Sequence, residues 1–312
     1  MKIQTVTGQI DPDDLGLTDG HNHLWITKQA VPAPDAPVLD QTEEILAELH
    51  IYRQAGGCSQ IDCQPVYAGR DGNKLHWLSE NSGVNVVANT GFHLRRYYPA
   101  EAPIWQMSGE QAVDFLIDEI KNGLQETRGN VDGVVFPGFI KIAVEKTLAE
   151  SPQHLIEAAV QASLETGCLI EMHTERGQDV EAITAFITDR GLSPDRLLLC
   201  HLDKRPDLAL HQALAKEGFG LEYDTFFREK YQPEKNLWLL IEAMVEAGLA
   251  ENLVLATDLA DASLWAFSGG IGIASFPKMI KTRLEMAGYE QEDIQAIMGG
   301  NIARRLAIED KE

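Results

Sequence analysis

The sequence predicts an α/β protein, a closed (β/α)8 TIM barrel that forms a single domain over residues 1–312. Short apolar or β-branched runs alternate with amphipathic helical stretches, and eight such pairs follow one another along the chain. Strands separated by helices pair in parallel through right-handed crossovers, and eight units suffice to close a barrel. A doubly wound open sheet is the alternative. No Gly-x-Gly-x-x-Gly follows an early strand, which disfavours its nucleotide-binding version.

The expected strands are, in chain order, 17–23, 58–63, 84–91, 134–143, 168–173, 196–201, 219–224 and 252–257. Between them, helical periodicity is clear over 42–56, where Gly56 is a stop signal. A later helix is expected between Ser151, as its N-cap, and Gly167 at its end. The glycine-rich stretch 268–272 comes late and lacks a Walker lysine, so we expect a loop there.

Charge and composition exclude several classes of function. The chain carries 48 acidic and 26 basic residues, a net charge of −22, which disfavours nucleic acid as a partner. No apolar run has the length of a membrane span, and the N-terminal segment MKIQTVTGQIDPDD lacks the apolar core of a signal peptide. The four cysteines lack zinc-type spacing, so we expect free thiols in a reducing cytoplasm.

Polar residues of a few types fall at the predicted strand ends, where barrel enzymes carry their chemistry. They are His21, His23, Lys141, His173, His201 and Asp258. His21 and His23 are two apart, so on a strand both imidazoles face the same side, an arrangement that suits a divalent metal. Each residue also has a structural alternative: a strand-end histidine is often merely hydrogen-bonded, and Asp258 could cap a helix. Their joint position at one barrel end favours a metal centre.

Lys141 is the unexpected member of this set, because a protonated amine repels a cation. It could simply pair with a carboxylate. Carboxylation by CO₂ would instead convert the amine to a carbamate, an anion with two oxygens that can bridge two metal ions.

At this point the pattern resembles the phosphotriesterase family of the amidohydrolase superfamily, from DGHNHLW at 19–25 to GGNIARRLAI at 299–308. The family pattern is His-x-His on strand 1, a carboxylated lysine on strand 4, single histidines on strands 5 and 6, and an aspartate after strand 8. All have counterparts here. Asp62 and the Gly-Arg-Asp at 69–71 also resemble the family's strand 2 region. Asn22 stands where relatives often have glutamate, and it should point away from the metals.

The resemblance implies a role for each residue. His21, His23 and Asp258 would bind the buried metal, His173 and His201 the more exposed one, and carboxylated Lys141 would bridge both. Zn²⁺ suits these ligands, with Mn²⁺ or Co²⁺ as alternatives. A hydroxide bridging the ions would be the nucleophile, and Asp258 would pass its proton to the leaving group. The resemblance also implies a homodimer.

The loops after strands 3, 6 and 7 are rich in basic residues although the protein is acidic. Arginine and lysine there would recognise a phosphate or carboxylate on the substrate; the alternative is that they balance nearby acids. The candidate substrate-binding residues are Lys204, Arg205, Arg228, Lys230, Tyr231, Tyr98 and His93.

The strand 7 and strand 8 regions resemble the family's branch that acts on sugar lactones, including phosphorylated ones. That branch often has a basic residue shortly after the strand 8 aspartate. This chain has Asp261 and Ala262 there, and an acid at this place would oppose a second phosphate. The resemblance and the basic loops together give the expected function, which is metal-dependent hydrolysis of a sugar lactone that carries an anionic group.

Three alternatives remain. One is a small-amide hydrolase. The second is a phosphotriesterase or phosphodiesterase, whose apolar pocket would come from Trp25, Phe92, Trp105, Phe226 and Trp265. The third is a metal-binding protein without catalysis.

Overall fold

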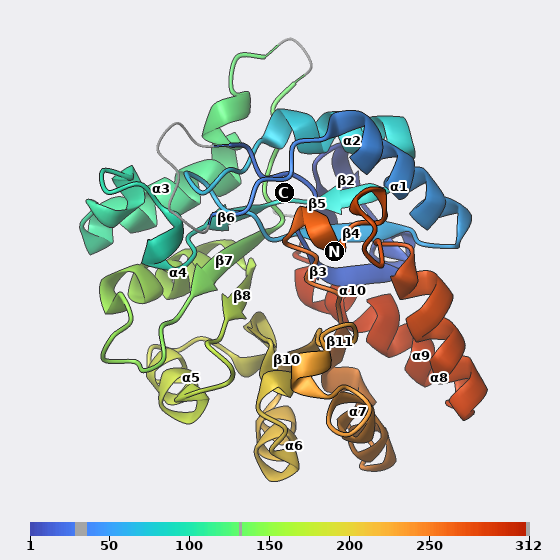
Figure 1. The fold of residues 1–312 in the computed structure, drawn as a ribbon. Coiled ribbons are helices and arrows are strands. Elements are labelled where there is room, and N and C mark those ends of the chain that lie inside the picture. The colour runs from blue at the N-terminus through green and yellow to red at the C-terminus, as the bar shows by residue number, and fades with distance from the viewer. Residues whose placement is uncertain (29–35, 131–132, 310–312) are drawn as a thin grey trace.

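The computed structural model describes residues 1–28, 36–130 and 133–309, and its core is a ring of parallel strands surrounded by helices (Figure 1). The strands of the ring are β3 (Thr18–Asn22), β4 (Ser59–Asp62), β5 (Asn85–Val87), β6 (Asn89–Gly91), β7 (Phe139–Ala143), β8 (Leu169–His173), β9 (Leu197–Cys200), β10 (Gly220–Tyr223) and β11 (Leu253–Leu255). They match the eight predicted strands, since β5 and β6 are the two halves of the third. The (β/α)8 prediction is confirmed.

The strands form a six-stranded sheet, β6 to β11, and a three-stranded sheet, β3 to β5. The two sheets share the third barrel strand, which is interrupted at Ala88. They meet again between β3 and the end of β11. There the backbone N–H of Asp258 donates to the His21 carbonyl at 2.9 Å, and the Asp19 carboxylate accepts from the backbone and hydroxyl of Thr257 at 2.9 and 2.5 Å. These bonds bring the first strand beside the last.

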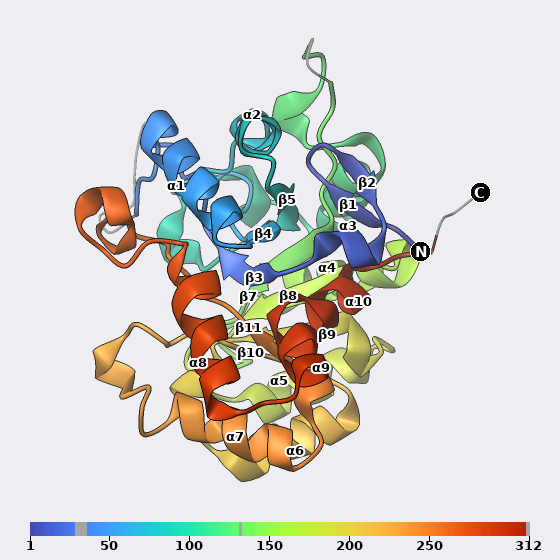
Figure 2. The ribbon, with the colours of Figure 1, turned by 90° about the vertical axis from the view of Figure 1, so that its right-hand side faces the viewer.

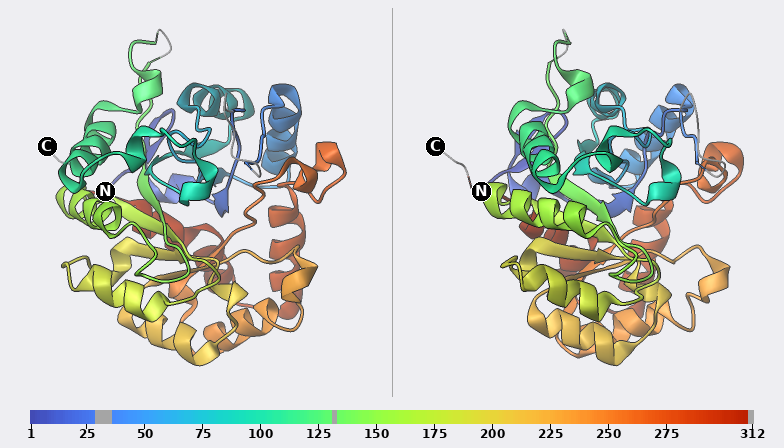
Figure 3. Two further views of the ribbon diagram at one scale, coloured as in Figure 1. Left: turned by 60° about the vertical axis from the view of Figure 1, so that its left-hand side comes forward. Right: turned by 90° about the vertical axis from the view of Figure 1, so that its left-hand side faces the viewer.

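Helices cover the outside of the strand ring, as the rotated views show (Figures 2 and 3). They are α1 (Thr42–Gln54), α2 (Gly72–Ser82), α3 (Gly109–Asn122), α4 (Gln153–Thr166), α5 (Val180–Thr188), α6 (Leu208–Glu217), α7 (Leu237–Glu246), α8 (Lys281–Ala287), α9 (Gln291–Gln295) and α10 (Asn301–Leu306). Within the described ranges, none of these helices is both long and apolar enough to cross a membrane.

Sequence reasoning did not foresee the hairpin that precedes the barrel. It consists of β1 (Ile3–Thr5) and β2 (Gly8–Ile10), paired antiparallel. Two bonds of 2.9 and 3.0 Å join Lys2 and Ile308, so the hairpin ties the beginning of the chain to the segment after α10.

Some element boundaries differ from the prediction for local reasons. The fourth strand begins at Phe139 rather than near 134, because Pro137 and Gly138 precede it and proline cannot donate to a strand ladder. Ser151 does not cap α4; its hydroxyl donates to the Thr147 carbonyl instead. Gly167 does end that helix, with φ +79°.

The Gly-Arg-Asp segment after β4 has a structural role. Arg70 is buried and pairs with Glu119 and Glu126, each at 2.7 Å. Asp71 accepts from the backbone of Asn73 and Lys74 and so caps α2. None of the four cysteines, all within the described residues, forms a disulfide, and three of them are buried.

Candidate metal centre and active site

The C-terminal ends of the strands surround a pocket of about 420 Å³. Its lining includes five of the six residues predicted as metal ligands: His21, His23, His173, His201 and Asp258. They come from four places in the barrel, namely β3 with the residue that follows it, β8, and the segments after β9 and β11. Residues 237 positions apart in sequence thus meet in one pocket, as the barrel prediction required.

His21, His23 and Asp258 form one potential ligand group. The Asp258 Oδ1 atom lies 3.8 Å from Nε2 of His21 and 3.7 Å from Nε2 of His23. Bonds of about 2 Å from each atom to a common divalent ion would produce separations of this size. The donor set therefore fits a metal.

His173 and His201 form a second potential group. Nδ1 of His173 lies 2.9 Å from Nε2 of His201, so the two nitrogens converge on one region. The ring of His201 also lies 5.0 Å from that of His21, centroid to centroid, which brings the two groups next to each other.

The second ring nitrogen of three histidines has its own partner. Nδ1 of His21 lies 2.9 Å from Oε1 of Glu222, and Nδ1 of His23 lies 2.8 Å from Oε1 of Gln64. Nδ1 of His201 is hydrogen-bonded to Asp224. Partners of this kind fix the tautomer and the ring orientation of metal-binding histidines, leaving Nε2 free for the ion.

Burial keeps all four histidines neutral near pH 7, the form that binds metals. It lowers the pKa of His23 to about 4 and that of His173 to about 3. It also lowers the pKa of His201, and that of His21 well below its ordinary value, where the nearby Lys141 charge acts in the same direction.

Two predicted ligands have a strained backbone. His201 has φ +66° and Asp258 has φ +48°, in the left-handed region that non-glycine residues rarely adopt. Such conformations cost about 1–3 kcal/mol and persist where the surrounding structure imposes them, often at functional sites. Their occurrence at both positions supports a functional role for this end of the barrel.

Asn22, between the two β3 histidines, points away from the ligand groups, as predicted. Its side-chain oxygen accepts from the backbone N–H of His23 at 2.9 Å and of Leu259 at 3.1 Å. It thereby ties β3 to the segment after β11.

Lys141 is completely buried in the barrel interior and does not line the pocket. Its Nζ atom lies 2.6 Å from Oε1 of Glu171 and 3.6 Å from the Cys200 sulfur. Burial alone would lower the pKa of Lys141, but Cys200, Cys63 and Glu171 around it outweigh this and raise it well above the ordinary value. The structure thus shows the carboxylate-paired amine that sequence reasoning kept open, and it leaves carboxylation a proposal.

Most of the predicted substrate-binding residues line the pocket: His93, Lys204, Arg228, Lys230 and Tyr231. Arg228 is engaged there by protein groups. Its guanidinium lies 3.0 Å from Oδ2 of Asp258 and donates to the carbonyls of Asp224, Thr257 and Asp258. Burial alone would raise the pKa of Asp258, but the Arg228 charge and His201 outweigh this and hold it lower.

Arg205 and Tyr98 are not part of the pocket wall. Arg205 forms ion pairs with Glu181 at 2.8 Å and with Asp207 at 3.6 Å, so these neighbouring carboxylates balance its charge. Tyr98 is buried, and its hydroxyl accepts from the backbone N–H of His93. The aromatic residues considered for an apolar phosphotriesterase pocket, Trp25, Phe92, Trp105, Phe226 and Trp265, also lie outside its lining.

Sequence reasoning missed several lining residues, including Gln64, Glu175 and Arg176. Arg176 follows His173 closely in the chain, so its position after β8 was the signal that could have identified it. Arg96, in a loop noted as basic, also lines the pocket and pairs with Glu175 at 3.2 Å.

A barrel that collects neutral histidines and an aspartate at its strand ends has the donor groups that a metal-dependent hydrolase requires. The model of the phosphotriesterase family matches residues 1–306, and the chain belongs to this family.

Similar proteins bear two kinds of name. An N-acetyltaurine hydrolase from Salmo salar is 27% identical over 98% of both chains. A phospho-furanose lactonase from Mycoplasmopsis synoviae is 26% identical, covering 99% of this chain and 92% of that one. Among solved structures, a lactonase from Listeria monocytogenes has a TM-score of 0.88 at 22% identity, covering 99% of this chain and 100% of that one. This last likeness concerns the fold.

Proposed function

We propose that this protein is a metal-dependent lactonase that opens a sugar lactone bearing an anionic group. The observation that carries the proposal is the pocket itself, where the histidine and aspartate groups lie beside a wall of cationic side chains. The wall includes Arg96, Arg176, Lys204, Arg228 and Lys230. The phospho-furanose lactonase relative supports this substrate class.

His21, His23 and Asp258 would hold one divalent ion, and His173 and His201 the other. Lys141, carboxylated in the active protein, would contribute to both. Imidazole and carboxylate ligands favour Zn²⁺, with Mn²⁺ or Co²⁺ as alternatives. When bound, the ions would lower the pKa of water to supply a nucleophile near neutral pH and polarise the substrate carbonyl.

The chain's own residues orient the reaction. Asp258 accepts a proton at Oδ2 and passes it to the leaving oxygen, and the Arg228 guanidinium 3.0 Å from that atom keeps the carboxylate ionised beforehand. Glu222, Gln64 and Asp224 hold the imidazole rings in place.

Lys230 and Tyr231 are the best placed to bind the anionic group. Lys230 is exposed, and its Nζ atom lies 5.0 Å from the Tyr231 ring centroid. Lys204 lies 3.8 Å from Oδ1 of Asp224, and Arg228 is bound to Asp258, so both charges are partly balanced by the protein. Because the protein balances the charge of Lys230 less, we expect Lys230 to attract a phosphate or carboxylate more strongly than Lys204 or Arg228 does.

The test is acid release from a panel of sugar lactones, each with and without a phosphate, using protein loaded with Zn²⁺ or Mn²⁺. Turnover of the phosphorylated members in preference to the neutral ones supports the proposal. Turnover of neutral lactones alone contradicts the proposal that the substrate is anionic. The absence of turnover with every lactone of the panel contradicts lactonase activity.

A second candidate is hydrolysis of a small acylated amine that carries an acid group. The N-acetyltaurine hydrolase relative favours it, because N-acetyltaurine bears a sulfonate that the same cationic wall would accept. Amine release from N-acylated amino sulfonates, assayed under identical conditions, distinguishes the two candidates.

A further inference from the structure

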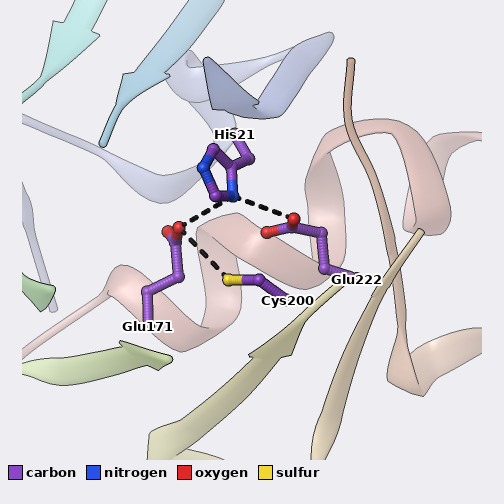
Figure 4. Close-up of side chains that lie close together, drawn as sticks. All are labelled: His21, Glu171, Cys200 and Glu222. Carbon is purple, nitrogen blue, oxygen red and sulfur yellow. Dashed lines mark hydrogen bonds and ion pairs between the residues drawn. The ribbon is translucent and has the colours of Figure 1, made fainter. Parts of the chain in front are cut away.

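Two carboxylates lie in the barrel interior beneath the predicted ligands, and the mechanism above uses only one of them. Glu171 on β8 and Glu222 on β10 are completely buried and flank His21 and Cys200 (Figure 4). The Oε2 atom of each has no hydrogen-bond partner among the described residues. Burying a charge is costly unless it is paired, so each carboxylate calls for a physical explanation.

The geometry assigns the two carboxylates different partners. Oε1 of Glu171 lies 2.6 Å from Nζ of Lys141 and 3.3 Å from Nδ1 of His21. Oε1 of Glu222 lies 2.9 Å from Nδ1 of His21. His21, Glu171, Cys200 and Glu222 are close enough to be taken for a separate metal site, but in this structure, where Lys141 is not carboxylated, Oε1 of Glu171 is paired with the Lys141 amine. Glu222 therefore has His21 as its partner.

Strand β10 carries Glu222, the partner of His21, and the residue just after this strand, Asp224, is the equivalent partner of another histidine. Asp224 follows Glu222 by two residues, immediately after β10 ends at Tyr223, and side chains two apart along an extended chain point to the same side. Asp224 is hydrogen-bonded to Nδ1 of His201, in the second ligand group. One histidine of each ligand group therefore has a carboxylate behind it, whereas the partner of His23 is the neutral amide of Gln64.

We propose that Glu222 is a positioning residue for the metal ion held by His21, His23 and Asp258. Its Oε1 atom accepts the Nδ1 hydrogen of His21, which directs the Nε2 lone pair toward the ion. Burial and the neighbouring Glu171 raise the pKa of Glu222 well above its ordinary value, so the inference depends on this hydrogen bond and not on a fixed negative charge. The inference rests on the metal centre of the proposed function.

The test compares two matched variants. Glu222→Gln and Asp224→Asn each replace one carboxylate of the same strand by an amide of similar shape. Metal-free proteins are titrated with Zn²⁺ against a competing chelator to obtain both dissociation constants, and histidine-ring NMR shows which imidazoles respond at each step.

We expect Glu222→Gln to weaken one of the two ions by about 10- to 100-fold, with the altered response at His21 and His23. Asp224→Asn should weaken the other ion, with the altered response at His173 and His201. A merely structural role for Glu222 would instead lower thermal stability and leave both constants unchanged.

Tyr223→Phe is the control, because it removes a buried hydrogen bond between the same strand and a histidine outside the centre. The Tyr223 hydroxyl lies 2.6 Å from Nδ1 of His211. This variant should bind both ions as the wild type does.

Wild-type affinity for both ions in Glu222→Gln would overturn the inference. If that variant fails to fold, Glu222→Asp keeps the carboxyl group but shortens the side chain by one methylene, which moves its oxygens away from His21. Selectively weaker affinity for the same ion supports the inference. Unchanged affinity overturns it. A wild-type protein that binds no Zn²⁺ would instead contradict the proposed metal centre itself.

Discussion

Replacing Arg228 by alanine should impair the hydrolysis of anionic and neutral lactones to the same extent. Sequence reasoning alone expected a larger loss for the anionic substrate. In the structure, however, the guanidinium lies 3.0 Å from Oδ2 of Asp258, and the two side chains are only 17% and 14% exposed. It also binds three backbone carbonyls. The substitution therefore removes the counter-charge of the proton-accepting carboxylate before it removes any contact with the substrate.

The size of the effect follows from the burial of this pair. Removing one partner of a buried ion pair costs about 3–5 kcal/mol. A loss of about 3 kcal/mol in the transition state corresponds to roughly a 100-fold lower kcat/KM, since each 1.36 kcal/mol is tenfold. The assay is kcat/KM for one sugar lactone with and without its phosphate, in wild type and Arg228→Ala. A loss at least tenfold greater for the phosphorylated substrate would contradict this prediction and make Arg228 an anion contact.

Three other outcomes follow from the site. Lys230→Ala should lower kcat/KM for the phosphorylated lactone by about tenfold or more and leave the neutral one nearly unchanged, because the exposed amine has no ion-pair partner among the described residues; equal losses would contradict its role. Lys141→Ala should reduce bound metal from two ions to one, with partial recovery on adding a short carboxylic acid; unchanged metal content and turnover would exclude it as a bridge. In uncarboxylated protein, where the Lys141 amine pairs with Glu171, adding Glu171→Gln to this variant avoids an unpaired buried carboxylate, which would cost about 3–5 kcal/mol. The metal-free protein should lose stability as the pH falls from 6.5 to 4: the unfolded chain takes up a proton at His23 near 6.5, whereas the folded chain resists until about 4, so this group alone removes about 3 kcal/mol from the free energy of unfolding. Urea unfolding at a series of pH values checks this, and a flat profile would contradict it.

The strand order and the positions of the predicted ligands in the barrel could be derived from the sequence because both depend on local patterns. Apolar runs of strand length end in His21, His173 and His201, and parallel strands in a barrel bring such ends together. The direction of the Asn22 side chain followed from the twofold alternation of a strand. None of these predictions needed knowledge of the loops.

The barrel interior and the loops were harder to predict for different reasons. Glu171 and Glu222 interrupt otherwise apolar strands, in CLIEMH and FGLEYD. This pattern indicates buried carboxyl groups, but the sequence analysis did not single them out. Whether a loop residue lines the pocket depends on the backbone conformation of the loop, which the residue type alone does not predict. Arg176 lines the pocket and has φ +61°, whereas Arg205 binds Glu181 and Asp207 away from it, although both are basic residues close to a strand end.

Metal-dependent lactonase activity is tested most directly by kcat/KM for a phosphorylated sugar lactone and its unphosphorylated counterpart, before and after metal removal by a chelator. We predict turnover that favours the phosphorylated substrate, disappears on chelation and returns when Zn²⁺ or Mn²⁺ is added back. Turnover that survives complete metal removal, or that favours the neutral lactone, would contradict a metal-dependent lactonase for anionic substrates.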